Sequence, residues 1–410
     1  MSAKPDRPPL AAGPLDTAAA AARAAALQRA RALAPALRAR AAEADAERRL
    51  PQATIDELLE AGLFGVIRPR SFGGEELGIA SLVEITAELA AACGATGWVY
   101  GVLAGHGWLL NLFPVAAQEE ILDDPNALTA TVFRLGGKAE RVDGGYRLTD
   151  ATGRFCSGID FASWVIVGNA VHNGNGPPEP RFFVVNRRDI EVVDDWFTVG
   201  MRGTGSRSIR IRDAFVPEHF SVTLESLAMG SSPGAATHKA PLYKTPFQLV
   251  APFSIIGAPL GIARGAVETF RAGLQPFLAG QSQDEVAGKA ATLARIGQAS
   301  AEADAAFALV HAAAMKIDRM TDPQSITPED RARFPRDWAW AAQTSREAVS
   351  RLFTAAGGNA TFEGSDIQRQ WRDVNAAAQH FAFVWDNAMT DYGRVALGFE
   401  PINTMPGKRR

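Results

Sequence analysis

Cysteine is scarce in this sequence, and neither sign of charge predominates. The 410 residues include two cysteines, Cys93 and Cys156, with no CxxC pair, so a disulfide framework and a cysteine-rich metal site are excluded. We take the same scarcity to indicate a reducing compartment, the cytoplasm. Lys and Arg number 42 against 45 Asp and Glu, a net charge of −3. This balance predicts no binding to nucleic acid or to a charged membrane surface.

Several short motifs with a known mechanism are also missing. No GxGxxG follows a predicted strand and there is no Walker A loop, so neither a Rossmann unit nor a P-loop is indicated. The sequence also has no HExxH and no paired histidines at helical spacing for a metal. We therefore predict no metal. Any redox chemistry must use a cofactor that is bound without these motifs.

Hydrophobic residues are plentiful and include one long uncharged run. They make up 47% of the chain, enough for large cores. Residues 90–118 carry no charge and outnumber the ~20 residues that cross a bilayer. The run is interrupted by five glycines, His106, Asn111 and Pro114, and acidic residues flank it on both sides. We interpret it as a helix buried inside a helical domain.

The first third of the chain reads as helical. After a disordered lead over residues 1–16, a helical domain is predicted for 17–122, with a break or kink at Pro35. Two capping boxes are expected to open helices within it, Thr54-Ile-Asp-Glu57 and Ser81-Leu-Val-Glu84.

The hydrophobic period then changes to that of strands. Residues 123–225 are predicted to form an antiparallel β-domain. Asp143-Gly-Gly145 marks a hairpin turn, and buried strands are expected at 164–167 and 182–185. Residues 208–212 alternate as a half-exposed strand.

The last third returns to helix. Residues 226–246 read as a loop and a plausible substrate lid, and 401–410 as a loose tail. Residues 247–400 are predicted to form an antiparallel four-helix bundle, with helices at 250–276, 284–320, 337–356 and 365–397. The fold class is therefore mainly α with a β-domain (α+β).

This order of domains resembles the acyl-CoA dehydrogenase fold, and three segments carry the resemblance. LPQATIDELLEAGLFGVIRPRSFGGEE (50–76) is similar to the N-terminal signature of that fold, and MRGTGSRSIRIRDAFVPEH (201–219) to its β-domain signature. GGNATFEGSDIQRQWRD (357–373) is similar to its C-terminal Gly-Gly…Arg-Asp segment. Matching segments extend over about 20–400.

Within that fold the chain resembles the reduced-flavin-dependent monooxygenases. The dehydrogenases carry a catalytic Glu a few residues beyond the Arg-Asp pair, whereas here Arg372-Asp373 is followed by His380, with no carboxylate before Asp386. GWVYGVLAGHGW (97–108) and GRFCSGID (153–160) also look like this oxygenase branch.

The resemblance implies an activity and its partners. The chain would be the oxygenase component of a two-component system, an oxidoreductase that uses FMNH2 or FADH2 and O2 through a flavin C4a-hydroperoxide. It would hydroxylate, or oxygenate at N or S, a small aromatic or heteroaromatic substrate. A separate NAD(P)H-dependent reductase would supply the flavin, and the expected assembly is a homotetramer (a dimer of dimers).

The resemblance also assigns roles to individual residues. Ser157 would hold the proton at flavin N5, and His380, with a pKa near neutrality, would lie beside C4a. His106 would accept the proton of a phenol or amine. Further flavin contacts would come from Trp98, Thr131 and Trp196. Arg202 and Arg207 read either as ligands of the flavin phosphate or as solvated loop arginines.

Each assignment has an alternative. Without the resemblance, these histidines, tryptophans and hydroxyl residues would be read as parts of the core, a strand or a turn. For the whole chain, a second hypothesis is an acyl-CoA dehydrogenase with a relocated carboxylate, Glu363 or Glu400. A third is a non-catalytic flavin carrier or scaffold subunit that kept the fold.

Overall fold

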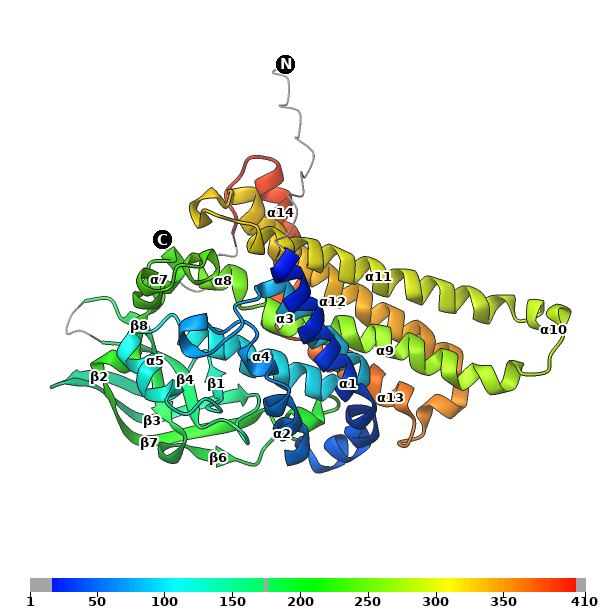
Figure 1. The fold of residues 1–410 in the computed structure, drawn as a ribbon, viewed down its shortest axis with the longest axis horizontal. Coiled ribbons are helices and arrows are strands. Elements are labelled where there is room, and N and C mark those ends of the chain that lie inside the picture. The colour runs from blue at the N-terminus through cyan, green and yellow to red at the C-terminus, as the bar shows by residue number, and fades with distance from the viewer. Residues whose placement is uncertain (1–16, 173–175, 403–410) are drawn as a thin grey trace, which may run out of the picture.

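The computed structural model describes residues 17–172 and 176–402, and its helical and β parts share one continuous hydrophobic core. The β-sheet occupies one end of the molecule and long helices extend away from it (Figure 1). The lead predicted for 1–16 and residues 403–410 of the predicted tail lie outside the described residues.

The N-terminal region is helical. They are α1 (Thr17–Glu47), α2 (Gln52–Glu60), α3 (Ile79–Ala92), α4 (Gly94–Leu110) and α5 (Val115–Leu122). The helix α1 continues through Pro35, so it is not broken there, and a kink at Pro35 stays a prediction. The uncharged run 90–118 is not one helix, because it spans the end of α3, all of α4 and part of α5, but its residues are mostly buried as expected. A separate segment, Phe247–Leu278, is long and apolar enough to cross a membrane, and 89% of its most apolar window is buried inside the protein.

Neither predicted capping box is formed. The helix α2 begins two residues before Thr54, and α3 begins two residues before Ser81. The carboxylate of Asp318 instead accepts hydrogen bonds from the backbone N–H groups of Ile79 (2.6 Å) and Ala80 (2.9 Å). This cap comes from a residue almost 240 positions away, so no local pattern could reveal it.

Eight strands form one sheet, and it is mixed rather than antiparallel. Its order is β6-β7-β3-β2-β4-β5-β8, and β1 also pairs with β4. The strands are β1 (Thr129–Val132), β2 (Lys138–Val142), β3 (Gly145–Cys156), β4 (Trp164–Val171), β5 (Glu179–Asn186), β6 (Glu191–Val193), β7 (Arg207–Pro217) and β8 (Ser221–Thr223). The β2–β3 hairpin is antiparallel as predicted. However, β1 pairs with β4 in parallel, because the intervening hairpin lets the chain re-enter the sheet in its original direction.

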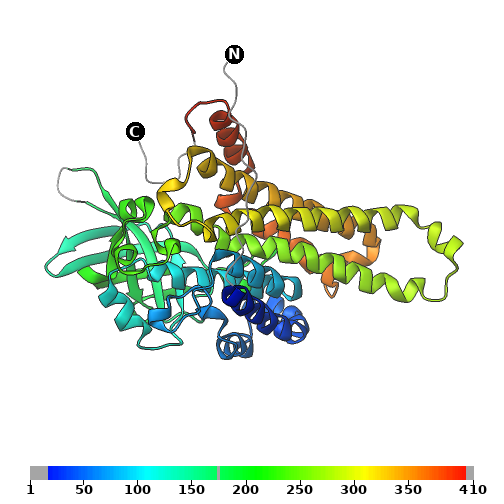
Figure 2. The same cartoon turned by 45° about the horizontal axis from the view of Figure 1, so that its top comes forward.

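The C-terminal region contains three long helices and several short ones. Figure 2 shows the long ones, α9 (Phe253–Leu278), α11 (Ala290–Asp318) and α12 (Pro328–Ala356), running alongside one another. The expected fourth helix is divided into α13 (Asp366–Ala377) and α14 (Trp385–Ala396), so Asp373 and His380 do not share a helix. The short helices are α6 (Leu224–Met229), α7 (Pro233–Thr237), α8 (Phe247–Val250) and α10 (Gln283–Ala287).

The segment 226–246 consists largely of short helical turns packed on the N-terminal domain. The buried Tyr243 hydroxyl donates to the carbonyl oxygen of Ile67 (3.0 Å), and a ring nitrogen of His238 lies 2.8 Å from the side-chain oxygen of Gln118. That this segment acts as a lid stays a prediction.

Candidate functional site

Glycines allow α4 to lie close to its neighbours. A Cβ atom at Gly97 would come within 2.4 Å of Ala90 in α3, and one at Gly101 or Gly105 would collide with Ser254 in α9. The three glycines are spaced four apart and lie on one face of the helix. The close packing that they permit places α4 at the centre of the protein, where Trp98 and His106 are both buried.

Trp98 lies beside the end of strand β3. Its indole Nε1–H donates to the hydroxyl oxygen of Ser157 at 3.2 Å. A β-bulge between Gly153 and Cys156 brings the chain to this position, and within it Phe155 has φ 65°, a left-handed value that is costly for an aromatic residue. The side chain of Phe155 is 67% exposed and contacts the ring of Trp196, with centroids 6.0 Å apart.

His380 meets Trp98 from the other side. It follows the end of α13, and its ring centroid lies 5.8 Å from that of Trp98 in an edge-on arrangement. Its Nδ1 accepts a hydrogen bond from the backbone N–H of Ala382 (3.2 Å), so the neutral ring carries its proton on Nε2. Burial lowers the pKa of His380 to about 4. The near-neutral pKa expected from the sequence is therefore not found.

His106 lies on the same helix as Trp98, next to an aromatic cluster. Its ring meets Phe133 edge-on at 5.9 Å, and Phe133 in turn contacts Phe182, Phe247 and Phe381. Burial lowers the pKa of His106 to about 3, against a smaller opposing effect of a backbone hydrogen bond to Thr129. The Nδ1 atom of His106 is buried without a hydrogen-bond partner among the described residues.

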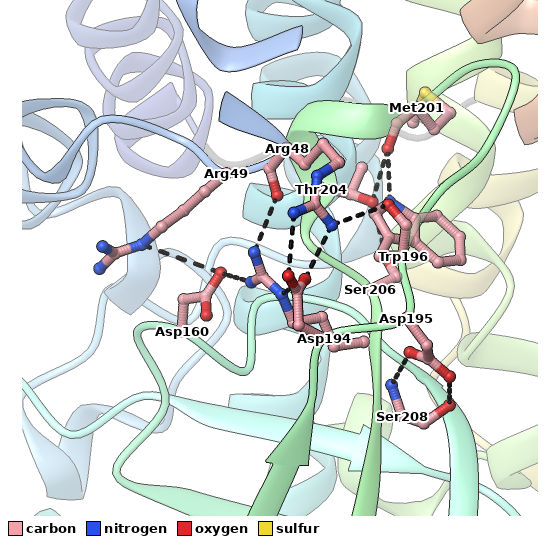
Figure 3. A network of polar contacts seen from close by, with 11 residues as sticks. Arg48, Arg49, Asp160, Asp194, Asp195, Trp196, Met201, Thr204, Ser206 and Ser208 are labelled. Atoms are coloured by element: carbon pink, nitrogen blue, oxygen red, sulfur yellow. Dashed lines mark hydrogen bonds and ion pairs between the residues drawn. The ribbon is translucent and has the colours of Figure 1, made fainter. Parts of the chain in front are cut away.

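The two remaining predicted flavin contacts differ in how they are satisfied. The Thr131 hydroxyl on β1 is buried and has no partner in the part of the chain that the structure describes. The indole N–H of Trp196 donates to the carbonyl oxygen of Met201 (3.1 Å), as Figure 3 shows. Thr131 is therefore free to bond a ligand, whereas Trp196 can offer only its ring.

The two arginines in this region are not simple solvated loop residues. The guanidinium of Arg207 is paired with Asp160 and with Asp194 (3.1 Å). Arg48 also binds Asp194, at 2.7 Å, as Figure 3 shows. Because two carboxylates already hold it, Arg207 is poorly placed to bind a phosphate. The Nε atom of Arg202 is buried without a partner among the described residues.

Sequence reasoning missed three polar residues behind Ser157. Asp373 is buried and accepts a hydrogen bond from the backbone N–H of Met201 at 2.6 Å. Burial raises the pKa of this carboxyl to about 6. Thr204 and Ser206 are buried between Met201 and Ser157. They lie within the 201–219 segment, whose resemblance to a family signature could have drawn attention to them.

The two carboxylates of the dehydrogenase hypothesis lie on the surface. Glu363 and Glu400 are both exposed, in the segments that precede α13 and follow α14. Within the described residues, neither makes a hydrogen bond or ring contact with Trp98, Ser157 or His380. No group of three or more His, Cys, Asp or Glu side chains that could hold a metal occurs there either.

Comparisons with known proteins agree with this architecture. The family model described as "Acyl-CoA dehydrogenase, N-terminal domain" matches residues 21–121, and "Acyl-CoA dehydrogenase, C-terminal domain" matches 254–385. The flavin-dependent monooxygenase oxygenase subunit HsaA of Mycobacterium tuberculosis is 34% identical over 90% of this chain and 94% of its own length. The oxygenase component of the FADH2-dependent resorcinol hydroxylase of Rhizobium sp. is 32% identical over 89% and 92%.

A solved structure extends the likeness to the whole fold. The 3-HSA hydroxylase of Rhodococcus sp. RHA1 superimposes with a TM-score of 0.88 at 30% identity, covering 92% of this chain and 98% of that one. The architecture is thus that of the acyl-CoA dehydrogenases. Within that fold, the chain belongs to the flavin-dependent monooxygenases, as an oxygenase component that uses reduced flavin. The family, enzyme class and cofactor predicted from the sequence are confirmed.

The residues present fit a flavin. Thr131 Oγ1 is a buried polar atom without a partner among the described residues, and native proteins rarely leave such an atom unsatisfied. The Ser157 hydroxyl oxygen has a lone pair to spare, and Trp98 and Trp196 offer aromatic rings next to it.

Proposed function

We propose that this chain hydroxylates a small phenolic substrate, with the reduced flavin held by Trp98, Ser157 and His380. One observation carries the proposal. Three residues from separate elements, α4, the end of β3 and the break after α13, meet through a 3.2 Å hydrogen bond and a 5.8 Å ring contact. Thr131 and Trp196 extend the same site. Reduced flavin, when bound, supplies the two electrons that allow one atom of O2 to enter the substrate while the other leaves as water.

The side chains of this site have separate tasks. Ser157 holds the proton at flavin N5, because loss of that proton would release hydrogen peroxide without product. His380 is neutral above about pH 4, so its Nε2–H would be available as a donor to the reacting oxygen. Apolar rings around His106, including Phe182 and Phe247, keep water out.

His106 is proposed to take up the phenolic proton. Because Nδ1 has no partner, we infer that the hydrogen bond to the Thr129 backbone involves Nε2 and holds the ring proton there, which leaves Nδ1 as an acceptor next to the aromatic cluster. One named relative, the resorcinol hydroxylase, acts on a phenol. Together these observations favour a phenol over an acyl thioester as the substrate class.

The proposal extends to partners and location. A two-component oxygenase receives its flavin from a separate reductase, which we take to depend on NAD(P)H in the cytoplasm. We propose a homotetramer, supported by exposed apolar side chains around α14: Phe381, Val384, Trp385, Leu397 and Phe399. Analytical ultracentrifugation tests this assembly. We further propose that residues 226–246 open to admit substrate.

The experiment that tests the function mixes the protein with FMNH2 or FADH2 without oxygen, adds oxygenated buffer and a panel of small phenols, and measures product and hydrogen peroxide. The expected result is a hydroxylated product in excess of peroxide. In Ser157→Ala and Thr131→Val the ratio of product to peroxide should fall, by about 100-fold for Ser157→Ala, the scale of losing one preorganised hydrogen bond. A wild-type protein that yields only peroxide from every phenol would refute the proposed substrate class. An unchanged ratio in Ser157→Ala would refute the site.

A further inference from the structure

A row of hydroxyl groups leads away from Ser157. Its Oγ lies 2.6 Å from Oγ of Ser206, and Ser206 Oγ lies 2.7 Å from Oγ1 of Thr204. Thr204 Oγ1 lies 2.8 Å from the carbonyl oxygen of Met201. All three hydroxyl residues are buried, with 7% exposure or less.

The number of protons fixes the direction of these hydrogen bonds. Three oxygen–oxygen contacts at such distances require three protons, and the three hydroxyl groups carry one proton each. The Met201 carbonyl carries none, so Thr204 must donate to it. Ser206 must then donate to Thr204, and Ser157 must donate to Ser206. Every hydroxyl proton in the row therefore points away from Trp98 and toward Met201.

The far end of the row is rigidly held. Met201 has φ 54°, and its backbone N–H donates to the buried Asp373 carboxylate at 2.6 Å. Its carbonyl oxygen also receives the indole N–H of Trp196 (3.1 Å) and the backbone N–H of Thr204 (3.1 Å). Figure 3 shows Trp196 and Thr204 both directed at this oxygen. The acceptor on which the whole row depends thus stays in place.

We propose that Thr204 and Ser206 make Ser157 an obligate hydrogen-bond acceptor, and that this is how the site selects reduced over oxidised flavin. The proposal rests on the proposed function, in which Ser157 faces flavin N5. At Ser157 the proton is already given to Ser206, and one lone pair accepts the Trp98 indole N–H. What remains for a ligand is a second lone pair, which can receive a hydrogen bond but not give one.

The two redox states of flavin differ at this atom. Reduced flavin carries a hydrogen on N5 and can donate to Ser157. Oxidised flavin has only a lone pair on N5, which would face the lone pair of Ser157 in a buried site without a proton between them. Thr204 and Ser206 are positioning residues in this arrangement, since they act on the flavin only through Ser157.

The test compares dissociation constants of oxidised and reduced FMN, measured by titration, the reduced form under anaerobic conditions. Ser206→Ala removes the acceptor for the Ser157 proton. Thr204→Val is isosteric and frees the Ser206 proton to turn toward Ser157. Either change leaves Ser157 able to donate to oxidised N5. We expect oxidised FMN to bind about 3- to 10-fold more tightly in both variants, the scale of one net hydrogen bond, with reduced FMN changed by less than about 2-fold.

Two control variants should leave the ratio of the two dissociation constants unchanged. Thr204→Ser keeps the hydroxyl group and should keep the wild-type ratio of the two constants. Ser208→Ala makes the same substitution two residues beyond Ser206, where the hydroxyl donates to Asp195 (2.6 Å, Figure 3), and should also leave the ratio unchanged. Thermal unfolding confirms that each variant is folded, and the isosteric Thr204→Val keeps the test valid where Ser206→Ala is unstable.

The outcomes separate this proposal from the proposed function. If Ser157→Ala changes the ratio but Ser206→Ala and Thr204→Val do not, Ser157 contacts the flavin and the directed row is overturned. If none of the three changes the ratio, Ser157 is not at N5 and the proposed site itself is wrong. The proposal is supported if the dissociation constant of oxidised FMN divided by that of reduced FMN falls in Ser206→Ala and Thr204→Val and keeps its wild-type value in Thr204→Ser.

Discussion

The two sides of the site differ in how completely their hydrogen bonds are satisfied. On the Ser157 side each hydroxyl group has its partners, and the row ends at a carbonyl oxygen fixed by several donors. On the His106 side, Nδ1 of His106 is buried with no partner among the described residues. Both sides are equally shielded from water, so burial alone does not explain the difference.

The difference indicates what each side does. A saturated network holds one side chain in one orientation, which suits the recognition of a group whose position is constant, such as the flavin. An unsatisfied buried atom carries a desolvation cost that a ligand can remove, which suits a substrate that comes and goes. On the unsatisfied side, removal of a polar atom should therefore impair the reaction at little cost in stability.

His106→Phe tests that statement and should have the largest effect. Removing the acceptor should slow hydroxylation about 1000-fold, within the usual range for a positioned general base. Loss of the unpartnered nitrogen should contribute about 1 kcal/mol to the free energy of unfolding, but loss of the hydrogen bond to the Thr129 backbone offsets it, so the stability should stay close to that of wild type while the ring contact with Phe133 persists. Single-turnover product formation and urea unfolding measure the two quantities.

Thr86→Val is the matched control for His106→Phe. The Thr86 hydroxyl in α3 is another buried, partnerless group within the described residues, and it lies outside the proposed site. The control should gain stability without losing activity. A hydroxylation rate in His106→Phe equal to that of wild type would contradict the assignment.

Asp373→Asn tests the Ser157 side of the site, because Asp373 binds the backbone N–H of Met201, the residue at which the row of hydroxyl groups ends. Burial raises the pKa of Asp373 to about 6 from 3.8, so its favourable contribution is complete below pH 3.8 and is lost as the pH rises through about 6. Asn can still accept the Met201 N–H and does not ionise. The variant should match wild type near pH 3.5 and exceed it at pH 7 by as much as about 3 kcal/mol in urea unfolding.

The control for Asp373→Asn should respond in the opposite direction. Asp330 is also buried, and burial alone would raise its pKa, but the hydrogen bonds from Lys316 and Thr327 and the charge of Lys316 together lower the pKa of Asp330. Its stabilising contribution is present above the unfolded pKa and is lost as the pH falls. Asp330→Asn should therefore lose stability at pH 7. If Asp373→Asn were instead destabilised equally at both pH values, ionisation of the Asp373 carboxyl would carry no free-energy cost in the folded protein.

Much of this architecture follows from local sequence patterns. The β2–β3 hairpin and the strand at 182–185 depend on turn residues and apolar runs, and both are formed. The family resemblance brought Trp98, Ser157 and His380 to attention from three distant segments, and these residues do meet.

What could not be predicted depends on contacts between distant segments. The cap of α3 comes from Asp318, so the pattern at Ser81 was misleading. The parallel pairing of β1 with β4 is decided by how the chain returns to the sheet. The direction of the Ser157 proton follows from the hydrogen bonds among Ser157, Ser206 and Thr204, and these depend on how the fold places the three residues. The pKa of His380 depends on the packing around it.

The pH dependence of the reaction sharpens the comparison and should show the smallest effect. Burial lowers the pKa of His380 to about 4 and that of His106 to about 3, both from 6.5. Above pH 6.5 the neutral histidines make their full contribution to stability. This contribution is lost as the pH falls toward 4, because the unfolded chain then binds protons at these histidines and the folded chain does not. With a phenol that stays protonated throughout, the single-turnover hydroxylation rate should change by less than about 2-fold between pH 6 and 8, since neither imidazole titrates there. An inflection near pH 6.5 that disappears in His380→Ala would show instead that His380 titrates during the reaction. The saturated and unsatisfied sides would then be coupled through a charged histidine rather than through neutral hydrogen bonds.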